Sequence, residues 1–125
     1  MILGTGIDLC EVPRMQAQIQ VPAADFVAQV FLPGEIAYCQ GKRHPAEHFA
    51  ARFAAKEAVV KALAATGGQG SFWLDIEIRN EPDGRPAVTL HGRALEMADA
   101  LGVRRILVSL THTREMAAAT VVLEG

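Results

Sequence analysis

The chain has 125 residues, half of them hydrophobic and 21% charged, and its formal net charge at pH 7 is −2. This length and composition predict one domain, residues 1–125, with a sizeable apolar core, and they argue against a disordered chain. The slight negative charge gives no general attraction to nucleic acid, and no stretch approaches the roughly 18 apolar residues that a membrane helix needs.

The N-terminal part of the chain is expected to form a strand followed by short helices. Residues 2–8 are apolar and too few for a helix, so we predict a buried strand. Gly4 and Gly6 within it indicate a bulge or a close approach of another backbone. Asp8 ends this run and is either a helix cap or a ligand at the end of a strand. Short helices are then predicted over residues 12–20, 23–32 and 35–39.

Residues 48–65 predict one long helix, because they are rich in alanine, leucine and lysine and contain no glycine or proline. Its apolar residues recur closely enough to the helical period to bury one side. Glu57 and Lys61 are four residues apart and therefore lie one turn apart on a single stripe. The simplest interpretation is a surface ion pair worth roughly 0.3–0.5 kcal/mol. A functional role for this pair depends on the rest of the chain.

Histidine and cysteine spacings do not predict a metal site. His44 and His48 are four residues apart, but Pro45 follows His44 where the zinc-protease pattern requires glutamate. Cys10 and Cys39 have no metal-ligand spacing, so we expect two reduced thiols in a cytoplasmic protein.

The C-terminal half is expected to contain two hairpins with a helix between them. The glycine-rich residues 66–71 follow a helix instead of opening one, so they fit a helix stop and neither nucleotide-binding loop pattern. Alternating or apolar runs bounded by turns predict strands over residues 72–79, 86–90, 104–111 and 117–123, and an amphipathic helix over 92–101. The sum is an α+β fold in which helices form one layer on a mainly antiparallel sheet.

Four motifs resemble those of a known family in both order and spacing. They are G-I-D-L-C-E from Gly6, R-F-A-A-K-E-A-x-x-K-A from Arg52, D-I-E-I-R from Asp75 and S-L-T-H-T from Ser109. Together they resemble the bacterial holo-[acyl-carrier-protein] synthases, the small trimeric branch of the 4′-phosphopantetheinyl transferase superfamily. The resemblance implies that superfamily's fold, a mainly antiparallel sheet packed by a long central helix.

The resemblance also implies an activity. These enzymes transfer 4′-phosphopantetheine from coenzyme A to a serine of an apo-acyl carrier protein and release 3′,5′-ADP, with Mg²⁺ as cofactor. It assigns Asp8 and Glu57 as metal ligands, which fits the one or two carboxylates that magnesium usually takes beside phosphates and water. Lys61 would offset the charge that builds on the departing 3′,5′-ADP. The base that accepts the serine proton stays open.

Further residues match positions where this family binds coenzyme A. Each has a simpler alternative: Arg43 as a solvated loop residue, Gly84 as a hairpin glycine, His112 as a turn histidine. The implied coenzyme A-binding set is Lys42, Arg43, Arg52, Lys61, Gly84, Pro86, Thr111 and His112.

The resemblance implies two protein partners. One is the acidic helix of the carrier protein, contacted near Arg14 and Met15; the other is the chain itself, as a homotrimer with sites between subunits. Residues 22–32 contain no lysine or arginine, so electrostatic steering of an acidic carrier is expected to be weak. The carrier, of fatty-acid or polyketide synthesis, therefore stays open.

Two other hypotheses remain at this stage. One is a non-catalytic carrier-protein or coenzyme A-binding module of the same fold, which would be expected to lose Asp8, Glu57 or Lys61. The other is an unrelated α+β oligomer in which Glu57 and Lys61 only form an ion pair.

Overall fold

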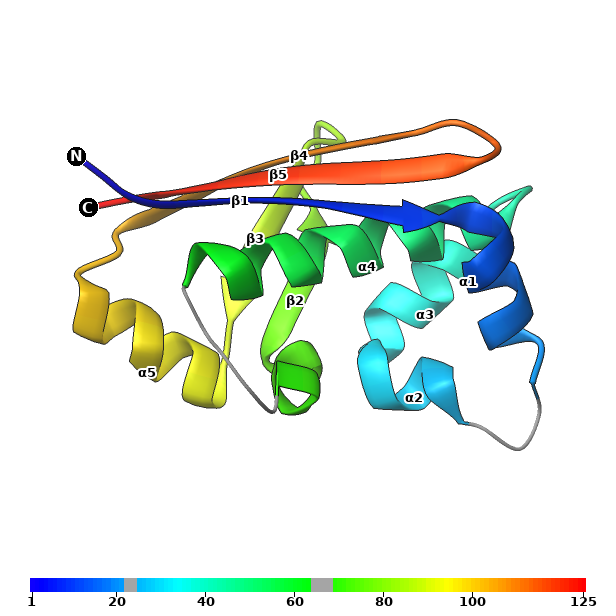
Figure 1. Ribbon diagram of the computed structural model, residues 1–125, viewed down its shortest axis with the longest axis horizontal. Helices are drawn as coiled ribbons and strands as arrows, with labels where there is room; N and C mark the ends of the chain where they lie inside the picture. Colours follow the sequence, from blue (N-terminus) through cyan, green and yellow to red (C-terminus); the bar gives the residue numbers. More distant parts are fainter. Residues whose placement is uncertain (22–24, 64–68) are drawn as a thin grey trace.

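The protein is an α+β fold built around one long helix (Figure 1). The computed structural model describes residues 1–21, 25–63 and 69–125. A three-stranded antiparallel sheet of order β1-β5-β4 covers one side of helix α4, and a separate two-stranded hairpin, β2–β3, also packs on it. The elements are β1 (Ile2–Glu11), α1 (Val12–Ile19), α2 (Phe26–Val30), α3 (Pro33–Gln40), α4 (Pro45–Ala62), the 3₁₀ helix η1 (Gln69–Asp75), β2 (Ile76–Asn80), β3 (Pro86–Leu90), α5 (Gly92–Leu101), β4 (Arg105–His112) and β5 (Met116–Glu124). The predicted fold class is confirmed.

Strand β1 lies directly against α4, with backbone touching backbone. A Cβ atom on Gly6 would overlap the carbonyl oxygen of Ala58, and one on Gly4 would overlap that of Ala62. The two glycines therefore permit the close approach that the sequence predicted. Since Gly4 meets the later helix residue and Gly6 the earlier one, β1 and α4 run in opposite directions, as Figure 1 shows.

The long helix differs from its prediction in its limits and in its burial. It begins at Pro45, a residue suited to the first turn, and residues 64–68 lie outside the described part of the chain. The expectation of one buried side is wrong: the sheet, the hairpin and the helices α1 and α3 all pack on α4, so most of its residues are buried. None of the helices that the structure describes is long and apolar enough to cross a membrane.

Two strand predictions also need correction. Strand β1 continues to Glu11, so Asp8 lies inside the strand on its helix-facing side and is not a cap. The strand predicted over residues 72–79 begins only at Ile76, because η1 precedes it. Here Lys56 Nζ bonds to the carbonyl oxygens of both Trp73 and Ile76. A strand points carbonyls three residues apart in opposite directions, so it cannot present both to one ammonium group.

The remaining predictions hold with small shifts. The strand over 86–90 and the helix over 92–101 have the predicted bounds, and both hairpins form. The helix predicted over 23–32 is shorter, at Phe26–Val30, with residues 22–24 outside the described part. Of the glycine-rich residues 66–71, the last three belong to η1 and the others lie outside the described part.

The core contains a charged pair that no sequence pattern predicted. Lys56 and Glu35 are 0% and 2% exposed, and their Nζ and Oε1 atoms are 2.8 Å apart. Burial lowers the pKa of Lys56, and the neighbouring Glu35 carboxylate partly offsets this effect. The pair joins α3 to the long helix through the interior.

Candidate functional site

Asp8 and Lys61 meet at the seam between β1 and α4. Lys61 Nζ lies 2.6 Å from Asp8 Oδ1 and donates to the carbonyl oxygen of Ile7 at 3.2 Å. The Lys61 side chain is 55% exposed, whereas that of Asp8 is 18% exposed. Lys61 therefore pairs with Asp8. The ion pairs of the described residues do not include one between Lys61 and Glu57, four residues earlier. The hypothesis of a simple helical ion pair is wrong.

Glu57 is held by an aromatic residue instead of a cation. The indole Nε1–H of Trp73 donates to Glu57 Oε1 at 2.6 Å. Gly6 opposes Ala58, and β1 and α4 run in opposite directions. Asp8 therefore lies at the level of the helical turn that carries Glu57. The structure brings the two predicted carboxylates to the same seam.

This pair of carboxylates suits a hard divalent cation that also binds phosphate. Within residues 1–21, 25–63 and 69–125, no three or more histidine, cysteine or acidic side chains converge as a metal site. Magnesium, however, commonly takes one or two protein carboxylates and completes its octahedron with phosphate and water. Asp8 Oδ1 and Glu57 Oε1 are each bound by one donor. Apart from the side chains of residues 69–71, which the structure does not describe, no protein donor of the described chain binds their second oxygens, so the donor set fits Mg²⁺.

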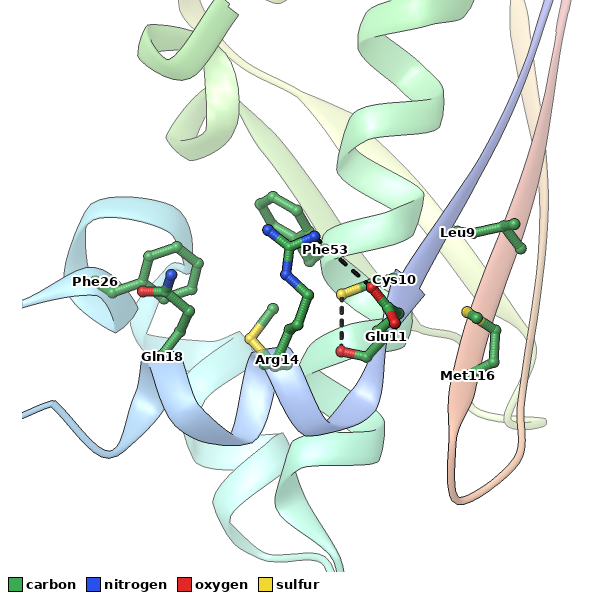
Figure 2. A pocket seen from close by; sticks show the side chains of 9 residues that line it. Leu9, Cys10, Glu11, Arg14, Gln18, Phe26, Phe53 and Met116 are labelled. Carbon is green, nitrogen blue, oxygen red and sulfur yellow. Dashed lines mark hydrogen bonds and ion pairs between the residues drawn. The ribbon is translucent and has the colours of Figure 1, made fainter.

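A groove of about 400 Å³ opens next to this seam (Figure 2). Cys10 follows Asp8 on the same face of β1, and Phe53 precedes Glu57 by one turn of α4, so the groove adjoins the carboxylates. Burial and the nearby Asp8 raise the pKa of Cys10 to about 11, which keeps its thiol neutral. The groove is lined by Leu9, Cys10, Glu11, Arg14, Met15, Gln18, Phe26, Phe53 and Met116.

A second cluster of charged residues surrounds Tyr38. The Arg52 guanidinium lies 4.0 Å from the centre of the Tyr38 ring, and Lys42 Nζ lies 4.5 Å from it. The ring of His48 stands edge-on to Tyr38 at 6.0 Å. Two of the predicted coenzyme A-binding cations thus share one aromatic platform, which stabilises them through cation–π contacts.

His112 joins this cluster from the end of β4. Its Nδ1 lies 3.1 Å from Glu47 Oε1, and its ring centre lies 5.0 Å from that of His48. Burial lowers the pKa of His48, and the neighbouring His112 and Lys42 lower it further. The sequence motifs pointed to His112 but not to Glu47 or Tyr38, and the spacing of His48 from His44 raised only the question of a zinc site. Glu47 lies in the first turn of α4, where acidic residues are common, so nothing in the sequence marked it.

The β2–β3 turn is tied to the same cluster through Asn80. Arg52 Nη2 donates to Asn80 Oδ1 at 2.6 Å, and Asn80 Nδ2 donates to the carbonyl oxygen of Gly84 at 3.1 Å. Pro86 pairs with Asn80 across the hairpin. Gly84 has a positive φ of 92°, so its role as a hairpin glycine is confirmed.

The predicted residues therefore fall into two groups. Arg52, Lys42, His112 and the turn form one network, whereas Arg43 and Thr111 are exposed and are not part of its hydrogen bonds. Glu47 and Glu57 are ten residues apart on α4, a separation of about 15 Å along the axis. The network around Tyr38 can bind an anion. The second group, Asp8, Glu57 and the exposed Lys61, can hold a cation against a polyphosphate.

Comparison with known proteins gives matches along almost the whole chain. The sequence pattern of the 4′-phosphopantetheinyl transferase superfamily matches residues 4–120. The chain is 48% identical to the holo-[acyl-carrier-protein] synthase of Koribacter versatilis, with 99% of each chain covered. It is 46% identical to that of Syntrophus aciditrophicus, covering 100% of this chain and 98% of the relative.

Solved structures agree with these sequence matches. The holo-[acyl-carrier-protein] synthase from Neisseria meningitidis has a TM-score of 0.84 at 30% identity and 100% coverage of both chains. The Helicobacter pylori holo-[acyl-carrier-protein] synthase in complex with coenzyme A has a TM-score of 0.82 at 30% identity, covering 96% of this chain and 99% of that one.

Proposed function

This chain belongs to the 4′-phosphopantetheinyl transferase superfamily, and we propose that it transfers 4′-phosphopantetheine from coenzyme A to a serine of an apo-acyl carrier protein, releasing 3′,5′-ADP. The observation that carries this proposal is the contact of Lys61 with Asp8 at the seam that also holds Glu57. The full-length relatives named as holo-[acyl-carrier-protein] synthases support the same activity. We propose residues 1–125 as one transferase domain.

Asp8, Glu57 and Lys61 are the proposed catalytic residues. Asp8 and Glu57 would hold Mg²⁺, which, when bound, neutralises charge on the pyrophosphate of coenzyme A. Lys61 is more than half exposed, so its ammonium can move from Asp8 to an oxygen of the departing 3′,5′-ADP as charge develops there. Asp8 keeps Lys61 near this position before the substrate binds.

The network around Tyr38 is the proposed anchor for the remaining phosphate of coenzyme A. Lys42, Arg52 and His112 supply positive or ionisable donors on a preformed aromatic platform. Lys61 completes this set at the pyrophosphate. The exposed or turn-forming members of the proposed set are Arg43, Gly84, Pro86 and Thr111.

The carrier protein is proposed to dock over the groove of Figure 2. Arg14 and Met15 both line it, but Met15 is only 3% exposed and packs in the core, so the exposed Arg14 supplies the contact and the predicted apolar contact by Met15 is not proposed. Arg14 is exposed and only 3.7 Å from Glu11, a pairing that a carboxylate of an acidic carrier helix can replace.

We further propose a homotrimer with sites between subunits, located in the cytoplasm. The cytoplasmic location is supported by two free thiols, Cys10 and Cys39, since cytosolic thiols are kept reduced. His112 contacts Glu47, and about 15 Å along α4 separate Glu47 from Glu57 within one chain. This separation supports the trimer. His112, together with Lys42 and Arg52 of its own chain, would then meet the Asp8, Glu57 and Lys61 of a neighbouring subunit.

The proposal is tested by the mass of an apo-acyl carrier protein after incubation with this protein, coenzyme A and Mg²⁺. We expect a gain of one phosphopantetheine group, and a chelator should abolish it. Glu57→Gln should lower the rate by roughly 100-fold or more, because it removes a metal ligand. It should change the free energy of unfolding by less than about 1 kcal/mol, because the amide oxygen can still accept from Trp73.

The alternative hypothesis, a non-catalytic carrier-protein or coenzyme A-binding module, gives a different result. Wild-type protein would then bind coenzyme A and the carrier without any mass gain, and Glu57→Gln would have no rate to lower. A chelator-resistant mass gain would instead contradict the metal assignment.

A further inference from the structure

We propose that Trp73 is a positioning residue for the metal ligand Glu57. Its indole N–H would hold one carboxylate oxygen and leave the other turned towards the divalent cation. This inference rests on the proposed function, which makes Glu57 a metal ligand.

The geometry of this contact is suited to fixing a carboxylate. The indole has one N–H donor and no acceptor, and it reaches Glu57 Oε1 at 2.6 Å. A hydrogen bond to an ionised acceptor is stronger than one between neutral groups. The Trp73 ring also packs on Phe53, with ring centres 5.7 Å apart, so its own orientation is restricted.

Two consecutive residues of α4 bind Trp73, one at its backbone carbonyl and the other at its indole ring. Lys56 Nζ bonds to the Trp73 carbonyl oxygen at 2.8 Å, while the next residue, Glu57, binds the indole. Lys56 is itself fixed by the buried carboxylate of Glu35. Glu35 also accepts from the backbone N–H groups of Leu32 and Ile78, each at 2.8 Å. The support for Trp73 therefore extends through the core to α3 and β2.

The contact also decides which partner Lys61 takes. Glu57 and Lys61 have the spacing at which opposite charges on a helix attract. With Glu57 turned to Trp73, Lys61 pairs with Asp8 instead. Without the indole N–H, Glu57 would be free to pair with Lys61, and that pair would compete with the cation for the carboxylate.

The experiment removes the N–H group without changing the shape of the ring. Trp73 is the only tryptophan of the chain, so replacing tryptophan during expression by β-(3-benzothienyl)alanine changes this position alone. This analogue has sulfur where indole has N–H. Trp73→Phe serves as a second variant that keeps an aromatic ring against Phe53. The matched control is Leu74→Ala, a 41% exposed neighbour on η1.

The readout is the affinity for Mn²⁺, measured by electron paramagnetic resonance on the protein–coenzyme A complex without carrier, so that no turnover occurs. We expect both Trp73 variants to bind Mn²⁺ about 10-fold or more weakly, as for other residues that orient a metal ligand. Leu74→Ala should bind as wild type does.

The outcomes separate the two proposals. Unchanged Mn²⁺ affinity in the analogue-substituted protein, with normal binding and carrier modification by wild type, overturns the positioning role and leaves the proposed function standing. Failure of wild type to bind Mn²⁺ overturns both the role of Trp73 and the metal-dependent mechanism.

Discussion

The three charged side chains at positions 56, 57 and 61 lie close in sequence but in very different environments. Lys56 is fully buried, Glu57 is half-buried and Lys61 is exposed. A buried ion pair contributes little net stability, but removing one partner leaves an uncompensated charge in the interior. The pair of Lys56 with Glu35 is therefore a point at which the fold is vulnerable.

We expect Glu35→Gln to lower the free energy of unfolding by about 3 kcal/mol. The amide removes the negative charge and has one acceptor oxygen where the carboxylate has two, so it cannot accept from the Ile78 N–H as well as from Lys56 and Leu32. Urea unfolding monitored by circular dichroism measures the change. Glu96→Gln, an exposed position on α5, is the control and should shift stability by less than about 0.5 kcal/mol. Equal effects of the two substitutions would contradict the assignment.

Sequence alone predicted Asp8, Glu57 and Lys61 as site residues but not their contacts. Spacing along a helix favoured a Glu57–Lys61 pair, whereas the partner of Lys61 comes from β1, 53 residues earlier. The buried Lys56–Glu35 pair was equally hidden, because helical periodicity does not locate a buried charge on a helix that is covered on several sides.

At the level of elements, the position of Asp8 depends on the contact of β1 with α4. Gly6 lies two residues before Asp8 on the same face of the strand, against the Ala58 carbonyl. Because both contacting groups belong to the backbone, Gly6 and Ala58 can separate only if strand β1 or helix α4 shifts.

Gly6→Ala should therefore separate β1 from α4. We expect a loss of about 1–3 kcal/mol in the free energy of unfolding, as for other overpacked sites, and a higher Mg²⁺ concentration for half-maximal transfer because Asp8 moves away from Glu57. The control is Gly34→Ala, where an added Cβ meets nothing within 4 Å. Thermal unfolding and Mg²⁺ titration of carrier modification provide the measurements. An Mg²⁺ requirement that stays at the wild-type value would show that Asp8 does not depend on this contact.

Elements with strong local signals were predictable, and those shaped by distant residues were not. The strand near Pro86–Leu90 and the helix Gly92–Leu101 were predicted well, since a turn glycine lies close to one end of each. Gly84 precedes the strand, and Gly102, in a left-handed conformation, follows the helix. The 3₁₀ helix at Gln69–Asp75 was missed, because the alternating pattern of its last residues indicates a strand. In the fold, Lys56 from α4 binds the carbonyl oxygens of both Trp73 and Ile76, which a strand cannot present to one group.

For the whole molecule, the side of the β1-β5-β4 sheet that faces away from α4 is rich in exposed apolar side chains. Ile7 and Leu9 on β1 are 63% and 62% exposed, and Leu107 on β4 is 41% exposed. Leu107 pairs with Val122 on β5, which pairs with Thr5 on β1, so this row crosses the sheet without a charged residue. A row of exposed apolar side chains across a sheet is typical of an interface between subunits.

We therefore expect Leu107→Glu to dissociate the proposed trimer, because three carboxylates would be buried in an apolar row, and Arg105 on the same face of β4 is already paired with Glu124. Size-exclusion chromatography with light scattering should give three times the chain mass for wild type and one chain mass for the variant. Transfer activity should fall with it, since the proposed site takes His112 from a neighbouring subunit. Leu101→Glu, a 46% exposed leucine at the end of α5, is the matched control and should stay trimeric. A wild-type protein that is monomeric while active would contradict both the trimer and the shared site, whereas a trimeric Leu107→Glu variant would place the interface on another surface.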